Sequence, residues 1–173
     1  MNVLESFSLK GKVALVTGGA GQYGRQIVEA LAEAGADTYI ASRNIENLEK
    51  VAKEENKRGY NVKAMQLDLS QDASIEKLHS AILEQSGKCD ILINNAVSRI
   101  HGNQGWDNPL DDFDKSLRIN GSALFKITQL FADDMKKRNS GSIINIGSMM
   151  GTVGVENGNY EGTDFSPATS PLY

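Results

Sequence analysis

The chain has 173 residues, of which 40% are hydrophobic and 23% are charged, and its formal net charge is -4. This composition is typical of one globular domain with a sizeable core, and the acidic balance gives no electrostatic reason to expect nucleic acid as a partner. A single cysteine excludes an internal disulfide, and no segment has the pattern of a signal peptide or a membrane span, so we predict a cytoplasmic protein without a membrane partner.

The first half of the chain alternates short apolar runs with amphipathic stretches. The apolar runs predict buried strands, because strands of parallel sheets are covered on both faces. Each run is followed by apolar residues at helical spacing and then by a glycine, which predicts an intervening helix. The predicted strands span residues 13–16, 38–41, 62–67 and 91–93, and the predicted helices span 23–34, 44–59 and the region around 75–82.

The second half begins with a predicted loop, residues 98–107. Asn108 then resembles a helix cap, with Pro109 at the first helical position. A separate, longer helix is predicted from about Ser122 to Lys137, and a fifth strand over 142–146. After that strand the sequence has no clear period.

Strands that alternate with helices imply right-handed crossovers and a parallel sheet. We therefore predict an α/β fold: a Rossmann-type doubly wound parallel sheet with helices on both faces. Residues 1–173 are expected to form a single dinucleotide-binding domain.

A glycine cluster lies between the first predicted strand and the first predicted helix. Gly19, Gly21 and Gly24 fit the pattern G-x-G-x-x-G, which allows a tight turn, close approach of the backbone to a pyrophosphate, and exposure of the free amides at the helix start. A glycine-rich turn without a ligand is the alternative. The strand before the cluster and the helix after it favour a dinucleotide site.

The end of the second predicted strand indicates which dinucleotide is bound. NAD-selective sites usually place a carboxylate there to bond the ribose 2′-hydroxyl, whereas this chain has Ser42 and Arg43. An arginine pairs well with a 2′-phosphate, so we predict NADP(H) as the cofactor. Arg43 could instead be a solvated residue at a helix start, and Arg25 could add a contact or lie on a helix surface.

Further motifs resemble the short-chain dehydrogenase/reductase family from about Leu9 to the last residue. Thr17, Gly18 and Gly24 match T-G-x-x-x-G-x-G, although Gln22 replaces the usual middle glycine and Gly21 stands one place earlier. The segment 94–96 matches N-N-A-G except for the following Val97.

The resemblance implies specific cofactor contacts. Asp68 occupies the position that contacts the adenine in this family, although it could merely cap the next helix. The residues expected to bind the cofactor are Gly18, Gly19, Gly21, Gln22, Tyr23, Gly24, Ser42, Arg43, Asp68, Leu69, Asn95 and Ala96.

The resemblance also implies a catalytic set that contains Asn120, Ser148 and a tyrosine with a lysine four residues later. Tyr160 is followed at that distance by Asp164, so Tyr173 is the better candidate, although the tyrosine could also be the residue that follows it. No lysine occurs after Arg138. We therefore expect a chain truncated near the catalytic tyrosine, about two-thirds of the family domain, in which the C-terminal elements are missing and the fifth strand has an open edge.

The leading hypothesis is an oxidoreductase that transfers a hydride between NADP(H) and a carbonyl or alcohol substrate, possibly a sugar derivative. The alternative is a non-catalytic dinucleotide-binding module or an inactive fragment. The full-length form is expected to be a homo-oligomer, a dimer or tetramer. No metal-ligand spacing is visible; His79 is expected to be a solvated residue, and Cys89 a buried small residue.

Overall fold

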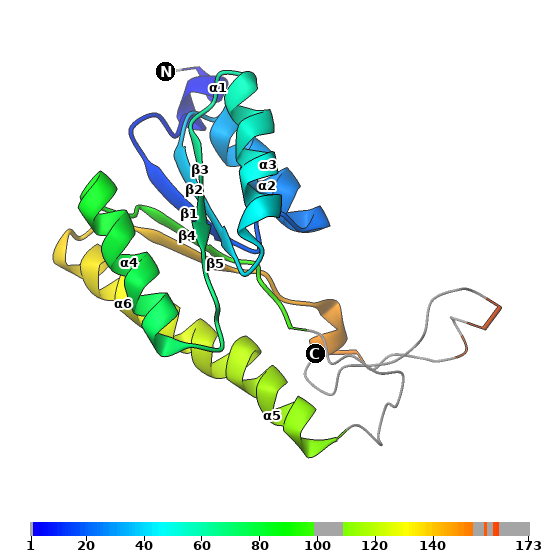
Figure 1. Cartoon of the computed structure of the whole chain (residues 1–173). Coiled ribbons are helices and arrows are strands. Elements are labelled where there is room, and N and C mark those ends of the chain that lie inside the picture. The colour runs from blue at the N-terminus through cyan, green and yellow to red at the C-terminus, as the bar shows by residue number, and fades with distance from the viewer. Residues whose placement is uncertain (1, 99–108, 154–157, 159–160, 163–173) are drawn as a thin grey trace.

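The computed structural model describes residues 2–98, 109–153, 158 and 161–162. Five strands form a parallel sheet in the order β3-β2-β1-β4-β5 (Figure 1). The strands are β1 (Val13–Thr17), β2 (Asp37–Ser42), β3 (Val62–Gln66), β4 (Ile91–Asn94) and β5 (Ser142–Asn145). Each agrees with its predicted range to within two residues, and the doubly wound parallel sheet is confirmed.

Helices cover both faces of the sheet (Figure 1). Their bounds are α1 (Val3–Ser6), α2 (Gln22–Glu33), α3 (Ile45–Lys57), α4 (Asp72–Ser86), α5 (Leu110–Leu117), the π-helix η2 (Arg118–Ala123), α6 (Leu124–Lys137) and the 3-10 turn η3 (Met149–Gly151). The short elements α1, η2 and η3 are not predicted by periodicity. Among the helices of the described ranges, none has the length and apolar character required to cross a membrane.

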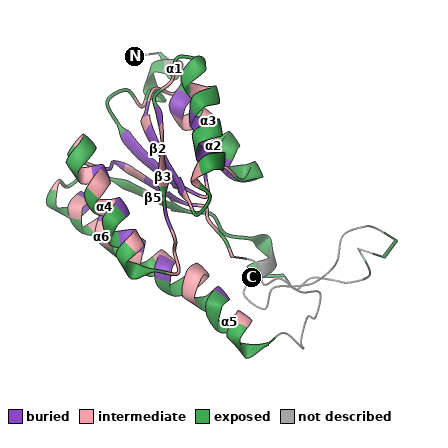
Figure 2. Ribbon diagram, viewed as in Figure 1, coloured by how far each residue is buried: buried purple, intermediate pink, exposed green. Residues whose placement is uncertain are grey.

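Two apolar layers hold the helices to the sheet. On one face, α2 and α3 pack on the strands through residues such as Val28 and Leu48. On the other face, α4 and α6 pack through residues such as Ile82 and Phe131. The central strands lie between these layers and are largely buried (Figure 2), as the continuous apolar runs predict.

The order of the strands reverses at β1, which pairs with β2 on one side and with β4 on the other. The chain continues outward from β2 to β3 on one side of β1 and from β4 to β5 on the other side. The carboxyl ends of β1 and β4 therefore border a crevice. At one edge of the sheet, β5 pairs with β4, and Ile144 on β5 is 46% exposed.

The region of residues 110–137 differs from the prediction. Two separate helices are expected, but α5, η2 and α6 follow one another directly, with Arg118–Ala123 in π-helical form. Pro109 is the N-cap residue of α5 rather than its first helical residue. The π-turn inserts extra backbone into a continuous helix, and such turns are frequent at functional sites.

A charge cluster around the buried Asp90 lies at the opposite end of the sheet. Asp90 is 5% exposed and accepts a hydrogen bond from the Val13 amide at 3.0 Å. Its carboxylate also pairs with Lys88 at 2.9 Å and with Arg138 at 3.0 Å. Burial opposes ionisation of Asp90, but the hydrogen bonds from Lys88, Val13 and Arg138 outweigh burial and lower its pKa.

His79 is not the solvated residue that the sequence suggests. Its Nε2 atom lies 2.6 Å from Asp134 Oδ2, and its ring meets the Phe131 ring edge-on with 4.9 Å between centroids. The side chain of His79 is 16% exposed because it lies between α4 and α6. The pair therefore joins two helices that the helical spacing alone could not place together.

Cys89 is buried, as predicted, and burial raises the pKa of its thiol to about 12. We expect a dithiopyridine reagent at about pH 8 to label native Cys89 far more slowly than an exposed thiol, because the reactive form is the thiolate. Labelling in denaturant should be rapid and stoichiometric. The absorbance of the released thione measures the labelling rate. Equal rates for the native and the unfolded protein would show that Cys89 is accessible.

Candidate functional site

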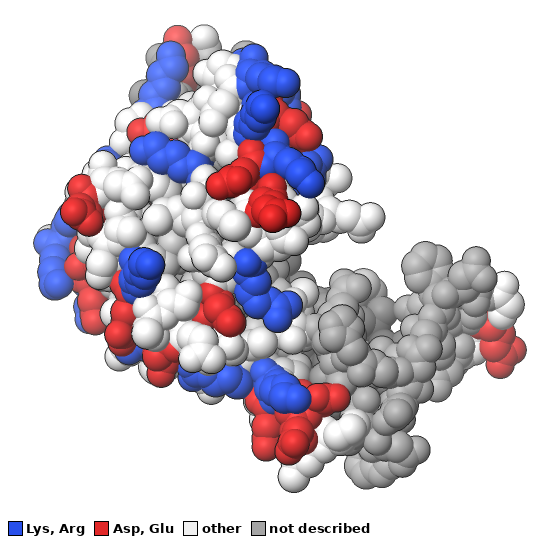
Figure 3. Space-filling model, in the orientation of Figure 1, with Lys and Arg blue, Asp and Glu red and all other residues white. Residues whose placement is uncertain are grey.

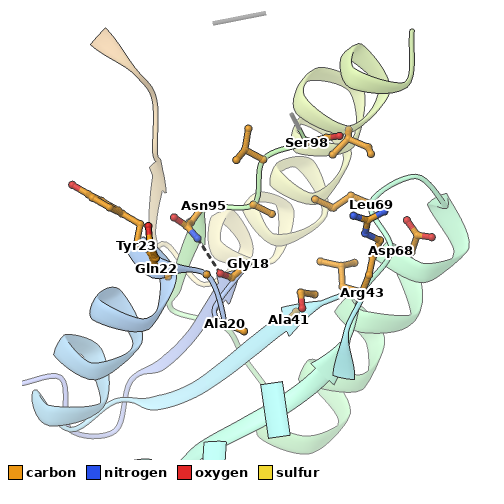
Figure 4. Close-up of a pocket in the computed structure, with 17 residues that line it drawn as sticks. Gly18, Ala20, Gln22, Tyr23, Ala41, Arg43, Asp68, Leu69, Asn95 and Ser98 are labelled. Atoms are coloured by element: carbon orange, nitrogen blue, oxygen red, sulfur yellow. Dashed lines mark hydrogen bonds between the residues drawn. The ribbon is translucent and has the colours of Figure 1, made fainter. Parts of the chain in front are cut away.

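A cleft of about 530 Å³ lies at the carboxyl ends of the strands, at the point where the strand order reverses (Figure 4). This volume is within the range of small-molecule sites. Every predicted cofactor residue except Gly19 lines it. These lining residues are Gly18, Gly21, Gln22, Tyr23, Gly24, Ser42, Arg43, Asp68, Leu69, Asn95 and Ala96.

Other lining residues are not predicted from the sequence. Ala41 and Leu67 stand next to predicted residues at the ends of β2 and β3, so the strand boundaries could have identified them. Ile119 has no comparable sequence signal, because its position depends on the π-helix. The remaining lining residues missed by the motifs are Ala20, Val97 and Ser98.

The glycine loop requires glycine for two separate reasons. Gly18 has φ +70°, and a Cβ there would lie 3.1 Å from the Ala96 Cα atom. A Cβ on Gly24 would lie 2.2 Å from the Gly18 carbonyl oxygen, so α2 can begin this close to the loop only without a side chain at that position. Gly19 faces β2 instead of the cleft: a Cβ there would lie 2.8 Å from Ile40.

The start of α2 borders the cleft without a side-chain cap. Its N-cap residue is Gly21, which makes no side-chain hydrogen bond to the helix. The Gly21 amide itself donates to the Gly18 carbonyl at 3.0 Å and closes the turn. The first amides of the helix are therefore available to an anion, and the residues present fit a dinucleotide pyrophosphate.

Thr17 and Asn95 join the glycine loop to the end of β4. The Thr17 hydroxyl oxygen accepts hydrogen bonds from the amides of Asn95 and Ala96, both at 3.0 Å. The Asn95 side-chain amide donates to the carbonyls of Thr17 at 3.0 Å and Gly18 at 3.2 Å (Figure 4). Asn95 thus sets the shape of the cleft wall that it lines.

Asn94, although adjacent, has a different position. It is 5% exposed, and its amide donates to Thr128 at 3.0 Å and to Asn145 at 2.9 Å. These hydrogen bonds tie β4 to α6 and β5. Asn94 therefore supports the site from behind and does not line the cleft.

Ser42 and Arg43 follow one another at the end of β2, and Arg43 lies at the same end of the cleft as Asp68 (Figure 4). Neither Ser42 nor Arg43 is a carboxylate, so a 2′-phosphate would find a cation there and no acid at the end of this strand. Arg25 is placed elsewhere: its guanidinium pairs with Glu54 at 3.0 Å on the exposed surface of α2 and α3.

Asp68 lines the cleft and also shapes the turn that follows β3. Its Oδ1 atom accepts hydrogen bonds from the Ser70 hydroxyl at 2.7 Å and from the Ser70 amide at 2.9 Å. These hydrogen bonds, together with the charge of Arg43, lower the pKa of Asp68. The N-cap residue of α4 is Gln71, so Asp68 is not the helix cap that the sequence leaves open.

Asn120 lies in the π-helix and holds the segment that leaves β4. Its Oδ1 atom accepts from the Ser98 amide at 2.8 Å, and its Nδ2 atom donates to the Ser98 carbonyl at 2.8 Å and to Ser116 Oγ at 3.1 Å. This two-way pairing with the backbone N–H and C=O of one residue fixes the orientation of the Asn120 amide.

Ser148 follows β5 and is exposed, and its carbonyl accepts from the Gly151 amide at 3.1 Å in the turn η3. Tyr173 and Tyr160, the two candidates for the catalytic tyrosine, lie outside the described residues, so their predicted roles stay predictions. Within the residues that the structure describes, no group of three or more His, Cys, Asp or Glu could hold a metal ion.

Charged side chains of both signs are interspersed over the visible face of the described residues (Figure 3). Several of them form ion pairs between neighbouring helices, such as Arg58 with Glu29 at 2.7 Å and Lys126 with Glu76 at 2.8 Å. Pairs of this kind between exposed groups each contribute little to stability, because solvent screens their charges.

Comparisons with known proteins agree with the fold. The sequence model of the short chain dehydrogenase family matches residues 12–162. The 2-dehydro-3-deoxy-D-gluconate 5-dehydrogenase of Bacillus subtilis (strain 168) is 38% identical over 146 residues, which are 84% of this chain and 56% of that protein.

Solved structures are similar as well. A gluconate 5-dehydrogenase from Burkholderia cenocepacia J2315 in complex with NADP and tartrate is 31% identical, with a TM-score of 0.75, over 85% of this chain and 57% of that one. A 7 alpha-hydroxysteroid dehydrogenase complexed with NADH and 7-oxo glycochenodeoxycholic acid is 30% identical, with a TM-score of 0.81, over 88% and 59%.

This chain spans a little over half the length of these relatives. The family match nevertheless covers most of the chain and includes both the glycine loop and the strand ends that form the cleft. The chain therefore belongs to the short-chain dehydrogenase/reductase family.

Proposed function

We propose that the protein is an NADP(H)-dependent oxidoreductase that interconverts a carbonyl and an alcohol on a small polar substrate of the sugar-acid class. The observation that carries this proposal is the composition of the cleft. An uncapped helix start lies in it, and Arg43 stands at the strand end where an NAD-selective site has a carboxylate.

Three groups of cleft residues would each bind a different part of the dinucleotide. The first amides of α2 would bind the pyrophosphate, close to Gly18 and Gly21. Ser42 and Arg43 would bind the 2′-phosphate, since guanidinium groups form strong charge-assisted hydrogen bonds with phosphate. Asp68 and Leu69 would enclose the adenine together with Ile119, which lines the same cleft.

The remaining predicted residues would act on the substrate. A bound nicotinamide supplies or accepts the hydride. Ser148 would orient the substrate carbonyl by a hydrogen bond, and the fixed Asn120 would shape the path by which a proton reaches the solvent. A tyrosine, for which Tyr173 is the candidate, would transfer the proton at the substrate oxygen.

A tyrosine with an ordinary pKa near ~10 needs a nearby cation to act as a base near neutral pH. The sequence has no lysine or arginine after Arg138. We therefore propose that the 173-residue chain binds the cofactor without turnover, and that a protein with a lysine four residues after its catalytic tyrosine is the active form.

The substrate class rests on two relatives. The Bacillus subtilis relative is named for a deoxygluconate derivative, and the Burkholderia cenocepacia relative is a gluconate dehydrogenase whose structure holds tartrate. Both names refer to hydroxylated carboxylates. Assays with gluconate-type and simple ketone substrates would test this choice, and activity confined to apolar ketones would contradict it.

The first prediction concerns Arg43. Arg43→Ala should weaken NADPH binding by about 1.5–3 kcal/mol, the worth of a hydrogen bond to a charged group, and should leave NADH binding nearly unchanged. Arg25→Ala is the matched control, because Arg25 pairs with Glu54 outside the cleft. Isothermal titration of both nucleotides measures the difference, and equal losses for NADPH and NADH would refute the assignment of Arg43.

The second prediction concerns the glycine loop. Gly24→Ala should abolish measurable dinucleotide binding, because its Cβ would lie 2.2 Å from the Gly18 carbonyl oxygen and would displace the loop or the helix. Gly87→Asn is the control: it lies at the far end of α4, has open space, and asparagine tolerates a positive φ. A folded Gly24→Ala variant with the affinity of the natural chain would place the ligand elsewhere.

The third prediction concerns catalysis in the full-length protein. Ser148→Ala should remove most of kcat, because it deletes the hydrogen bond that orients the carbonyl. Tyr160→Phe should have a far smaller effect, since Asp164 stands where a catalytic lysine is required. Steady-state assays with NADPH compare the two variants. The opposite ranking would show that this assignment of the active-site segment is wrong.

A further inference from the structure

Three consecutive residues of the π-helix connect three parts of the cleft. Ile119 lines it directly. Asn120 on one side pairs with the backbone N–H and C=O of Ser98, in the segment after β4. Arg118 on the other side reaches the turn between β3 and α4, where its Nε atom lies 3.5 Å from the Ser70 carbonyl and its Nη2 atom forms an ion pair with Asp72.

The turn that Arg118 contacts forms a wall of the cleft. Asp68 and Leu69 line the cleft, and the Ser70 amide and hydroxyl both donate to the Asp68 carboxylate. The Gln71 amide closes the turn by donating to the Asp68 carbonyl at 3.1 Å. Arg118 therefore holds the segment that directly follows this wall, through its hydrogen bond to the Ser70 carbonyl and its ion pair with Asp72.

We propose that Arg118 is a positioning residue for the adenosine half of the cofactor. It fixes the position of the wall formed by Asp68 and Leu69 relative to Ile119, which lines the same cleft. This inference rests on the proposed dinucleotide function and adds to it a residue outside the glycine and strand-end motifs. Arg118 does not line the cleft, so it acts through the turn and not by contact with the ligand.

Because the ion pair between Arg118 and Asp72 is largely exposed, its effect on the cleft can be distinguished from an effect on the stability of the protein. The side chains of Arg118 and Asp72 are 34% and 58% exposed, and pairs this open contribute little to the free energy of unfolding. Loss of the pair should therefore change the shape of the cleft wall much more than the thermal midpoint of the protein.

A matched control exists between α4 and α6, the helix that directly follows η2. Lys126 on α6 pairs with Glu76 on α4 at 2.8 Å, with side-chain exposures of 32% and 55%. Both ion pairs join α4 to the continuous helix formed by α5, η2 and α6, at similar exposures, and neither Lys126 nor Glu76 lines the cleft. A general loosening of the helices would follow from breaking either pair, whereas a change in nucleotide affinity should follow only from breaking the first.

The experiment uses the full-length protein and isothermal titration with NADPH and with 2′-phospho-AMP, which contains only the adenosine half. Arg118→Met should weaken both ligands by about three- to tenfold, the scale of one partly exposed ion pair with a hydrogen bond. Arg118→Lys should recover much of the loss, because it keeps the ion pair. The double variant with Asp72→Asn should lose little more than Arg118→Met alone, since the two residues act together.

Lys126→Met should keep both affinities within about twofold of the natural protein and should have a thermal midpoint similar to that of Arg118→Met. In assays at saturating substrate, Arg118→Met should raise KM for NADPH and leave kcat nearly unchanged. Unchanged affinities in Arg118→Met, or equal losses in Lys126→Met, would overturn the inference about Arg118 alone. Failure of the natural protein to bind either nucleotide would overturn the proposed function and this inference with it.

Discussion

The Thr17 hydroxyl is the point on which the cleft depends. It accepts hydrogen bonds from two successive amides after β4, and the Asn95 side chain returns two hydrogen bonds to the carbonyls of Thr17 and Gly18. The strands β1 and β4 are neighbours in the sheet but are not consecutive in the chain, so no single helix connects the end of one to the other. The hydroxyl and the amide supply that connection, and the glycine loop, the start of α2 and the β4 wall take their positions from it.

The two ends of the cleft differ in the charges that they present to a ligand. Near the start of α2, uncapped amides favour an anion without any charged side chain. At the other end, Arg43 faces an Asp68 carboxylate whose pKa is lowered by Ser70 and by Arg43 itself. A 2′-phosphate would add negative charge beside that carboxylate. Under the proposed function, Arg43 would therefore decide between the two dinucleotides, and Asp68 would limit the preference for NADP(H).

The sequence predicts the sheet and most of the site because both depend on local signals. Apolar runs and glycine stops define the strands and helices, and the cofactor motifs stand directly at the strand ends. The missed features depend on contacts between distant segments. Ile119 lines the cleft from within the π-helix, and His79 on α4 is partly buried against Asp134 and Phe131 of α6. Hydrophobic spacing carries no information about either contact, since it records which face of a helix is apolar and not which partner it meets.

The most direct test of this account is a crystal structure of the protein with NADP⁺. The account predicts the pyrophosphate over the first amides of α2, the 2′-phosphate within hydrogen-bond distance of Arg43, and the adenine between Leu69 and Ile119. The nicotinamide should then extend toward Ser148. A dinucleotide bound outside this cleft, or bound in it with the adenine at Ser148 and the nicotinamide at Asp68, would contradict the account.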